Sequence, residues 1–222
     1  YGLIFNPRHS QYSNASLRKA LSLGARSADY APMLGADTTE AFALVPPAVR
    51  MLGKEYRELV SQQSVQPAGQ DAAVLYTQAL EELGIASLES AQILVPAGLT
   101  DYAALHEIVR RWSDLFGFYI GIDPVDPETY AQRLRDGEYA IALYGMGSDY
   151  NSPAGALQQL LEQQGMLGMS EQTLRDVQAQ LQEAAGVETL SGTLEHYRAA
   201  ERLLLEDACF IPLLSLIHIS EP

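Results

Sequence analysis

Residues 91–96 read AQILVP, residues 118–122 read FYIGI and residues 139–144 read YAIALY, and these three short runs decide the fold. All three are dominated by residues that suit a strand. The last is a continuous apolar run, as expected for a strand covered on both faces. The segments between the runs are each long enough for a helix. The order strand–helix–strand–helix–strand predicts an α/β layer in which some neighbouring strands are parallel.

Both connecting segments carry helical signals. In the first, apolar residues recur at helical spacing and form one stripe, which consists of Leu105, Ile108, Val109, Trp112, Leu115 and Phe116. Thr100 is expected to cap this helix. The second helix is expected to begin at Asp126-Pro127-Glu128, where a capping residue, a first-turn proline and an acidic residue follow one another, and to end at Gly137.

The part of the chain before this unit predicts a strand and two helices. Residues 1–6, YGLIFN, predict the strand, and Ser13 or Asn14 is expected to cap the helix that follows. Residues 71–83 predict another helix, ended by a glycine. Its expected buried face carries Val74, Leu75, Ala79 and Leu83.

Residues 32–69 hold several glycines and prolines and predict a long irregular stretch with a short helix near residues 54–61. A stretch of this length inside a domain tends to be functional or to pack against another lobe. Beyond residue 144, the sequence predicts three helices and a last strand, over residues 153–164, 170–185, 193–208 and 210–213.

The chain ends in LSLIHISEP (residues 214–222), an apolar run that stops without a closing element. This run resembles translated sequencing-adapter read-through, so residues 214–222 are interpreted as a non-native tail. The alternative is an ordinary C-terminal strand.

Composition excludes several classes of protein. The 222 residues include 14 basic and 28 acidic side chains, a formal net charge of −14, which disfavours a nucleic-acid partner. No run of 18 apolar residues occurs, so no membrane-spanning helix is expected. The lone Cys209 is interpreted as a small buried hydrophobe. No phosphate-binding loop, nucleophile elbow or histidine pair at metal spacing is present, so neither an enzyme nor a cofactor is expected.

The segment GMGSDYNSP (residues 145–153) follows the third run and stands out for its chemistry. Ligands of α/β sheets bind at the carboxyl ends of strands, and two glycines allow a ligand to approach the backbone closely. The carboxylate of Asp149 can hold a cationic group such as an amine. Alternatively, Asp149 caps the helix that begins at Pro153 or closes an Asx-turn.

Several motifs occur in an order that is typical of one family. They are YGLIFN (1–6), QYSNASLRKAL (11–21), VPP (45–47), LFG (115–117) after the Trp112 helix, TY (129–130) with GEY (137–139), SDYNSP (148–153), and AE (200–201) through IP (211–212). With them, residues 1–213 resemble the C-terminal half of the bacterial family 5 extracellular solute-binding proteins. These are the oligopeptide- and dipeptide-binding proteins of ABC importers. The resemblance implies an α/β fold: an incomplete, periplasmic-binding-protein-like (class II) lobe with a mixed sheet flanked by helices.

The resemblance also implies a ligand site. In the family's peptide binders, the Asp of the motif pairs with the α-amino group of the peptide, and this residue corresponds to Asp149. Met146 and Gly147 correspond to residues that flank the ligand, and Tyr150 of the same motif is assigned to the site with them. The family often has Trp where this chain has Met146, so a flexible thioether replaces a flat aromatic wall.

For the whole protein, the resemblance implies that residues 1–213 are the C-terminal lobe of a two-lobed clamp, with hinge strands near residues 1–6 and 210–213. The implied partners are a peptide or other small solute and the membrane permease subunits of an ABC transporter, but no nucleic acid. The implied protein is a monomer that is periplasmic or membrane-anchored outside the cytoplasm.

Three other interpretations remain open. The same fold can bind a non-peptide solute such as a nickel chelate, a sugar or an opine, which the exchange at Met146 allows. The lobe can also belong to a ligand-sensing regulator fused to a DNA-binding domain. An enzyme is the third alternative, although no nucleophile–base pair supports it.

Overall fold

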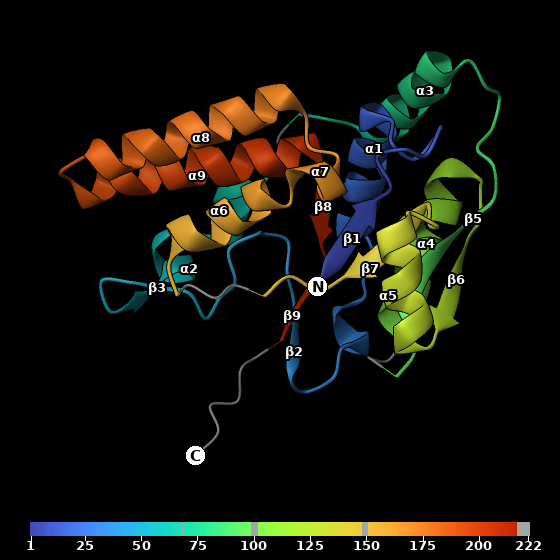
Figure 1. Cartoon of the computed structure of the whole chain (residues 1–222), viewed down its shortest axis with the longest axis horizontal. Coiled ribbons are helices and arrows are strands. Elements are labelled where there is room, and N and C mark those ends of the chain that lie inside the picture. The colour runs from blue at the N-terminus through green and yellow to red at the C-terminus, as the bar shows by residue number, and fades with distance from the viewer. Residues whose placement is uncertain (68, 99–101, 148–150, 217–222) are drawn as a thin grey trace.

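A five-stranded mixed sheet forms the centre of the molecule, with helices on both of its faces (Figure 1). This computed structural model describes residues 1–67, 69–98, 102–147 and 151–216. The expected α/β class, with a mixed sheet flanked by helices, is confirmed.

The strand order is β6-β5-β7-β1-β8. β5 (Ala91–Pro96) pairs in parallel with β6 (Ile120–Val125) and with β7 (Ile141–Tyr144). β1 (Gly2–Phe5) is antiparallel to β7 on one side and to β8 (Phe210–Pro212) on the other. The start of β1 therefore lies beside the ends of β7 and β8.

Alternate side chains of the sheet enter two separate cores. Leu3 and Phe5 of β1 face a core that includes α1, α3 and α4, whereas Ile4 faces a core that includes the remaining large helices. The helices of the first face are α1 (Ala15–Arg26), α3 (Ala72–Leu83) and α4 (Ala103–Phe116). Those of the second face are α5 (Pro127–Asp136), α6 (Pro153–Glu162), α7 (Gln164–Leu167), α8 (Glu171–Gly186) and α9 (Leu190–Asp207).

The long irregular stretch contains only short elements, as its glycines and prolines predict. They are the 3₁₀ turn η1 (Ala31–Met33), β2 (Thr38–Glu40), β3 (Arg50–Met51), β4 (Lys54–Glu55), α2 (Tyr56–Leu59) and the 3₁₀ turn η2 (Gln62–Val65). β2 pairs antiparallel with β9 (Leu214–Leu216). Of the tail expected over residues 214–222, the part beyond Leu216 lies outside the described residues.

Most helix boundaries agree with their sequence signals. Asn14 caps α1, because its side chain accepts a hydrogen bond from the Leu17 N–H at 2.8 Å. Asp126 caps α5, and Gly137 ends it in the left-handed conformation. α4 begins at Ala103, and the cap expected at Thr100 lies outside the part of the chain that the structure describes.

The prediction that Val74 belongs to the core is wrong. Val74 of α3 is 65% exposed, whereas Leu75 and Leu83 pack against the core and Ala79 is fully buried. The real buried stripe runs through residues 72, 75, 76, 79, 80 and 83, and at 100° per residue Val74 lies on the opposite side of the helix. By contrast, the expected burial of Cys209 is confirmed at 1% exposure.

Candidate ligand-binding cavity

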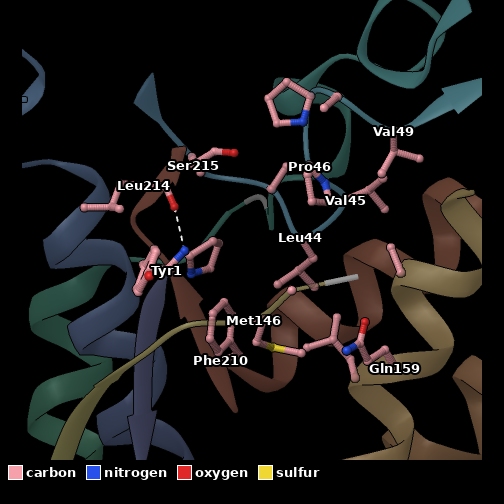
Figure 2. A pocket seen from close by; sticks show the side chains of 18 of the residues that line it. Tyr1, Leu44, Val45, Pro46, Val49, Met146, Gln159, Phe210, Leu214 and Ser215 are labelled. Carbon is pink, nitrogen blue, oxygen red and sulfur yellow. Dashed lines mark hydrogen bonds between the residues drawn. The ribbon is translucent and has the colours of Figure 1, made fainter. Parts of the chain in front are cut away.

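A cavity of about 600 Å³ lies at the edge of the sheet where β7 ends and β1 begins. The antiparallel pairing of Gly2 with Tyr144 and with Pro212 brings Tyr1, Gly145 and the end of β8 to one place. Figure 2 shows the cavity between residues 44–49 on one side and Met146, Phe210 and Gln159 on the other. Carboxyl ends of strands are the usual position for ligands in α/β sheets.

Residues 145–147 form the floor beside β7. An added Cβ at Gly145 would lie 2.8 Å from Cε1 of Tyr1, so only glycine allows this ring to pack there. Met146 is half-buried and packs against the second core, next to Phe210 in Figure 2. An added Cβ at Gly147 would meet no atom within 4 Å, so the backbone is open to the cavity at this glycine.

The backbone groups of Met146 and Gly147 form no hydrogen bond with any residue that the structure describes. Both residues were expected to flank a ligand, and both line the cavity. Asp149 and Tyr150, the other two expected site residues, lie outside the described residues. Within the described residues, main-chain donors and acceptors at the strand end are therefore left for a ligand backbone to pair with.

The helix that follows the motif is capped by a residue other than Asp149. Ser152 holds the N-cap position of α6, and its Oγ accepts a hydrogen bond from the Gly155 N–H at 3.1 Å. The cap position at Pro153 is therefore filled without Asp149. α6 then contributes Ala156, Gln159 and Leu160 to the wall of the cavity.

The opposite wall is residues 41–49, named here the wall loop. A buried carboxylate from α9 holds its backbone: Glu201 Oε1 accepts from the N–H of Leu44 at 2.7 Å and of Val45 at 2.9 Å. Arg57 of α2 completes the arrangement by donating through Nε and Nη2 to the Val45 carbonyl, at 2.9 and 2.6 Å. Both backbone polar groups of Val45 are thereby bonded to side chains.

Glu201 and Arg57 also form an ion pair with each other, in which Nη1 donates to Oε2 at 3.1 Å and Nη2 donates to Oε1. The side chain of Glu201 is 0% exposed and that of Arg57 is 10% exposed. The Arg57 guanidinium also lies 5.0 Å from the centre of the Tyr56 ring. Burial, and then the nearby Glu201 carboxylate, raises the pKa of Tyr56, whose hydroxyl has no hydrogen-bond partner in the described part of the chain.

Most of the cavity surface is apolar. Its apolar lining includes residues from the wall loop, α6 and β8, namely Ala43, Val45, Val49, Leu160, Phe210 and Pro212. Of the described lining side chains, Arg57 alone carries a formal charge, and this charge is neutralised by Glu201. The α-amino group of Tyr1, which also lines the cavity, donates to the Leu214 carbonyl at 2.7 Å, and burial lowers its pKa to about 6. No group of three or more His, Cys, Asp or Glu suited to a metal ion occurs in the described ranges.

Sequence reasoning found the floor of the cavity but missed the residues that shape its opposite wall. The length of the irregular stretch indicated that it is functional or packs against another lobe, and the wall loop lies within it. Nothing local in the sequence links Glu201 to Leu44 and Val45, which are more than 150 residues away. The signal that could have found Glu201 is an acidic residue within the apolar sequence of a buried helix, because such a charge requires a partner.

No protein-family model matches the chain, and no curated protein matches it. Solved structures do match it. The pheromone receptor PrgZ, described with its mode of peptide binding, has a TM-score of 0.74 at 19% identity and covers 97% of this chain and 42% of its own. The periplasmic murein tripeptide binding protein MppA, in an unliganded open form, has a TM-score of 0.70 at 18% identity, with coverages of 97% and 41%.

A third match, the peptide-binding protein of a peptide ABC transporter, has a TM-score of 0.70 at 19% identity and covers 96% of this chain and 97% of its own. The chain thus spans about two fifths of the length of PrgZ and MppA, but nearly all of this third structure. At these identities the likeness establishes the fold, and the predicted periplasmic-binding-protein-like lobe is confirmed. These neighbours are binding proteins rather than enzymes. None of the helices in the described ranges is long and apolar enough to cross a membrane.

Proposed function

We propose that the chain is the substrate-binding part of an ABC import system and that it captures peptides in the cavity at the end of β7. One observation supports this proposal above the others: at a strand end, Met146 and Gly147 present to a cavity main-chain groups that bond to no described residue, in a fold shared with peptide-binding proteins. Extended peptides are recognised largely through such main-chain hydrogen bonds.

In this proposal, Asp149 pairs with the α-amino group of the peptide, and Tyr150 lines the same site. Asp149 follows the open floor by two residues, so its carboxylate is within chain reach of the cavity. Ser152 holds the cap position of α6, so this position does not require Asp149. A charge-assisted hydrogen bond of this kind contributes about 1.5–3 kcal/mol.

Residues 1–213 would form one of two lobes, joined to the other through hinge strands near residues 1–6 and 210–213, and residues 214–222 would be a non-native tail. The pairing of β1 with β8 supports the hinge, because it places next to each other the two segments through which the chain would pass between the lobes. The complete protein would be a monomer outside the cytoplasm, periplasmic or anchored to the membrane, and would deliver its ligand to permease subunits. It would not catalyse a reaction. Closure of two lobes around the ligand is the expected mechanism.

The test is calorimetric titration of a free-amine peptide, and of its N-acetylated form, into the complete two-lobed protein. Asp149→Asn should weaken binding of the free amine by about 10- to 100-fold, while binding of the acetylated peptide should hardly change. Asp136→Asn is the matched control, because Asp136 is an exposed carboxylate at the end of α5. Equal losses for the two peptides would contradict the amine-pairing role.

A non-peptide solute is the second candidate, and the observation that favours it is Met146 in place of the aromatic wall. If neither peptide form binds to the wild-type protein, the same titration with a nickel chelate, a sugar and an opine tests this candidate.

A further inference from the structure

We infer that the cavity accepts an uncharged, apolar side chain of the ligand and discriminates against both acidic and basic side chains. This inference rests on the proposed function, because it names the class of ligand that the same site selects. It follows from the charges and contacts of the cavity wall rather than from the fold.

An acidic ligand side chain finds no free cationic side chain in the described lining, and the α-amino group of Tyr1 is bonded to the Leu214 carbonyl. The N–H groups of Arg57 point to protein acceptors: Nε to the Val45 carbonyl, Nη1 to Glu201 and to the Val60 carbonyl, and Nη2 to Val45 and Glu201. An incoming carboxylate would have to displace Glu201, which is fully buried and bonded to two backbone N–H groups.

A basic ligand side chain finds no carboxylate in the described lining either, and in the proposed function Asp149 is engaged by the α-amino group of the peptide. Glu201 lies behind the wall loop and is itself paired, so it offers no oxygen to the cavity. A charged group that enters an apolar cavity without a partner loses its hydration and gains little in return.

An apolar side chain, by contrast, matches the surfaces that face each other across the cavity. Val45 and Val49 lie on the wall loop, opposite Met146 and Phe210 (Figure 2), and Leu160 of α6 adds a further apolar side chain to the lining. Met146 adds adaptability, because a thioether can adjust to side chains of different shapes. The cavity therefore selects ligand side chains for their hydrophobicity more than for one particular shape.

The first experiment uses tripeptides with a free amine in which each position in turn carries Leu, Met, Glu or Lys, titrated into the complete protein. At one position, Leu and Met should bind about 10- to 100-fold more tightly than Glu and Lys, the effect of burying one large apolar side chain. If peptides bind but the four side chains are equivalent within about threefold at every position, the inference is overturned and the proposed function stands. If no peptide binds, the proposed function fails, and the inference fails with it.

The second experiment introduces a charge into the cavity. Gln159→Glu places a carboxylate on the lining of α6, and Gln158→Glu places the same charge on the exposed neighbouring position as a matched control. Gln159→Glu should shift the Lys-to-Leu affinity ratio at the selective position toward Lys by about tenfold or more, whereas Gln158→Glu should leave it unchanged. The ratio within one variant does not depend on how stable that variant is. Equal ratios in the two variants would overturn the inference.

Discussion

Glu201 is a carboxylate without exposed surface that accepts hydrogen bonds from two backbone N–H groups and from Arg57. Ion pairs buried to this extent contribute little net stability compared with apolar residues of the same size, but loss of one partner leaves the other charge buried and unpaired. The role of this ion pair is to fix the backbone of Leu44 and Val45 in one position. The wall of the cavity therefore depends on a residue that does not touch the cavity.

Glu201→Gln should lower the free energy of unfolding by about 3–5 kcal/mol, because the Arg57 guanidinium then lacks a counter-charge. Urea denaturation, followed by the fluorescence of the single tryptophan, measures this loss. Glu195→Gln on the exposed side of the same helix is the matched control and should change stability by less than about 0.5 kcal/mol. Similar losses in the two variants would show that Glu201 does not hold the wall loop.

Cys209 gives a prediction about pH. Burial, and then the nearby Asp207 carboxylate, raises the pKa of the Cys209 thiol to about 12. The pKa of an unfolded thiol is about 8.5, so above this pH the unfolded chain loses a proton that the folded protein keeps, and stability falls as pH rises. This group alone should lower the free energy of unfolding by about 1.4 kcal/mol between about pH 7.5 and about pH 9.5.

Urea denaturation at the two pH values measures the change, and Cys209→Ala should remove it. Burial also raises the pKa of Tyr12, Tyr30 and Tyr56, whose unfolded forms begin to ionise near pH 9.5, but this contribution is the same in the wild type and in Cys209→Ala and cancels in the difference between them. If the free energy of unfolding of Cys209→Ala fell with pH as steeply as that of the wild type, the thiol would ionise as readily in the folded protein as in the unfolded chain.

At the scale of elements, α1 and α4 approach each other closely through Gly24 and Trp112. An added Cβ at Gly24 would lie 2.7 Å from Cδ1 of the fully buried Trp112, whose Nε1 donates to the Leu21 carbonyl at 2.9 Å. Alanine favours a helix over glycine by about 1 kcal/mol, but overpacking costs about 1–3 kcal/mol. For an alanine at position 24, the cost of the clash with Trp112 therefore exceeds the gain in helix propensity.

Gly24→Ala should destabilise the protein and change its tryptophan fluorescence, because Trp112 has to move. Gly186→Ala at the end of α8 is the control, since an added Cβ there meets nothing within 4 Å. We expect the control to be neutral or slightly stabilising. Urea midpoints and emission spectra of both variants check this, and a stabilised Gly24→Ala would contradict the contact.

The elements that the sequence predicted well are those with local signals. The three apolar runs became β5, β6 and β7, and the caps at Asn14 and Asp126 are formed as expected, because strand patterning and capping act within a few residues. The prediction for Val74 was wrong because the spacing of apolar residues in α3 is compatible with more than one buried face. Only the contacts of α3 with α1 and α4 decide which face is buried. The pairing of Glu201 with the wall loop could not be predicted, since it joins distant parts of the chain.

For the molecule as a whole, β1 is the strand on which the two ends of the chain converge. Leu3, Ile4 and Phe5 have no exposed surface and pair on one side with β7 and on the other with β8. The sequence predicted strands at both ends, but not that they would be neighbours, because strand order depends on the complete fold.

Hydrogen exchange should reflect this arrangement. Amides of β1 should exchange only when the whole molecule unfolds, whereas those of the β3–β4 hairpin, which consists of two short, largely exposed strands, should exchange rapidly. Mass spectrometry of peptic fragments after timed labelling measures both. Comparable rates in the two regions would show that the sheet opens locally at its centre.

The position of β1 also has a consequence for how the protein is made. β1 leaves the ribosome well before its two partners, which begin at Ile141 and Phe210. At about 5–20 residues per second, an entirely apolar strand waits on the order of ten seconds for its first neighbour and longer for its second. We therefore expect the yield of folded protein to respond strongly to translation speed and to the supply of chaperones that shield nascent chains.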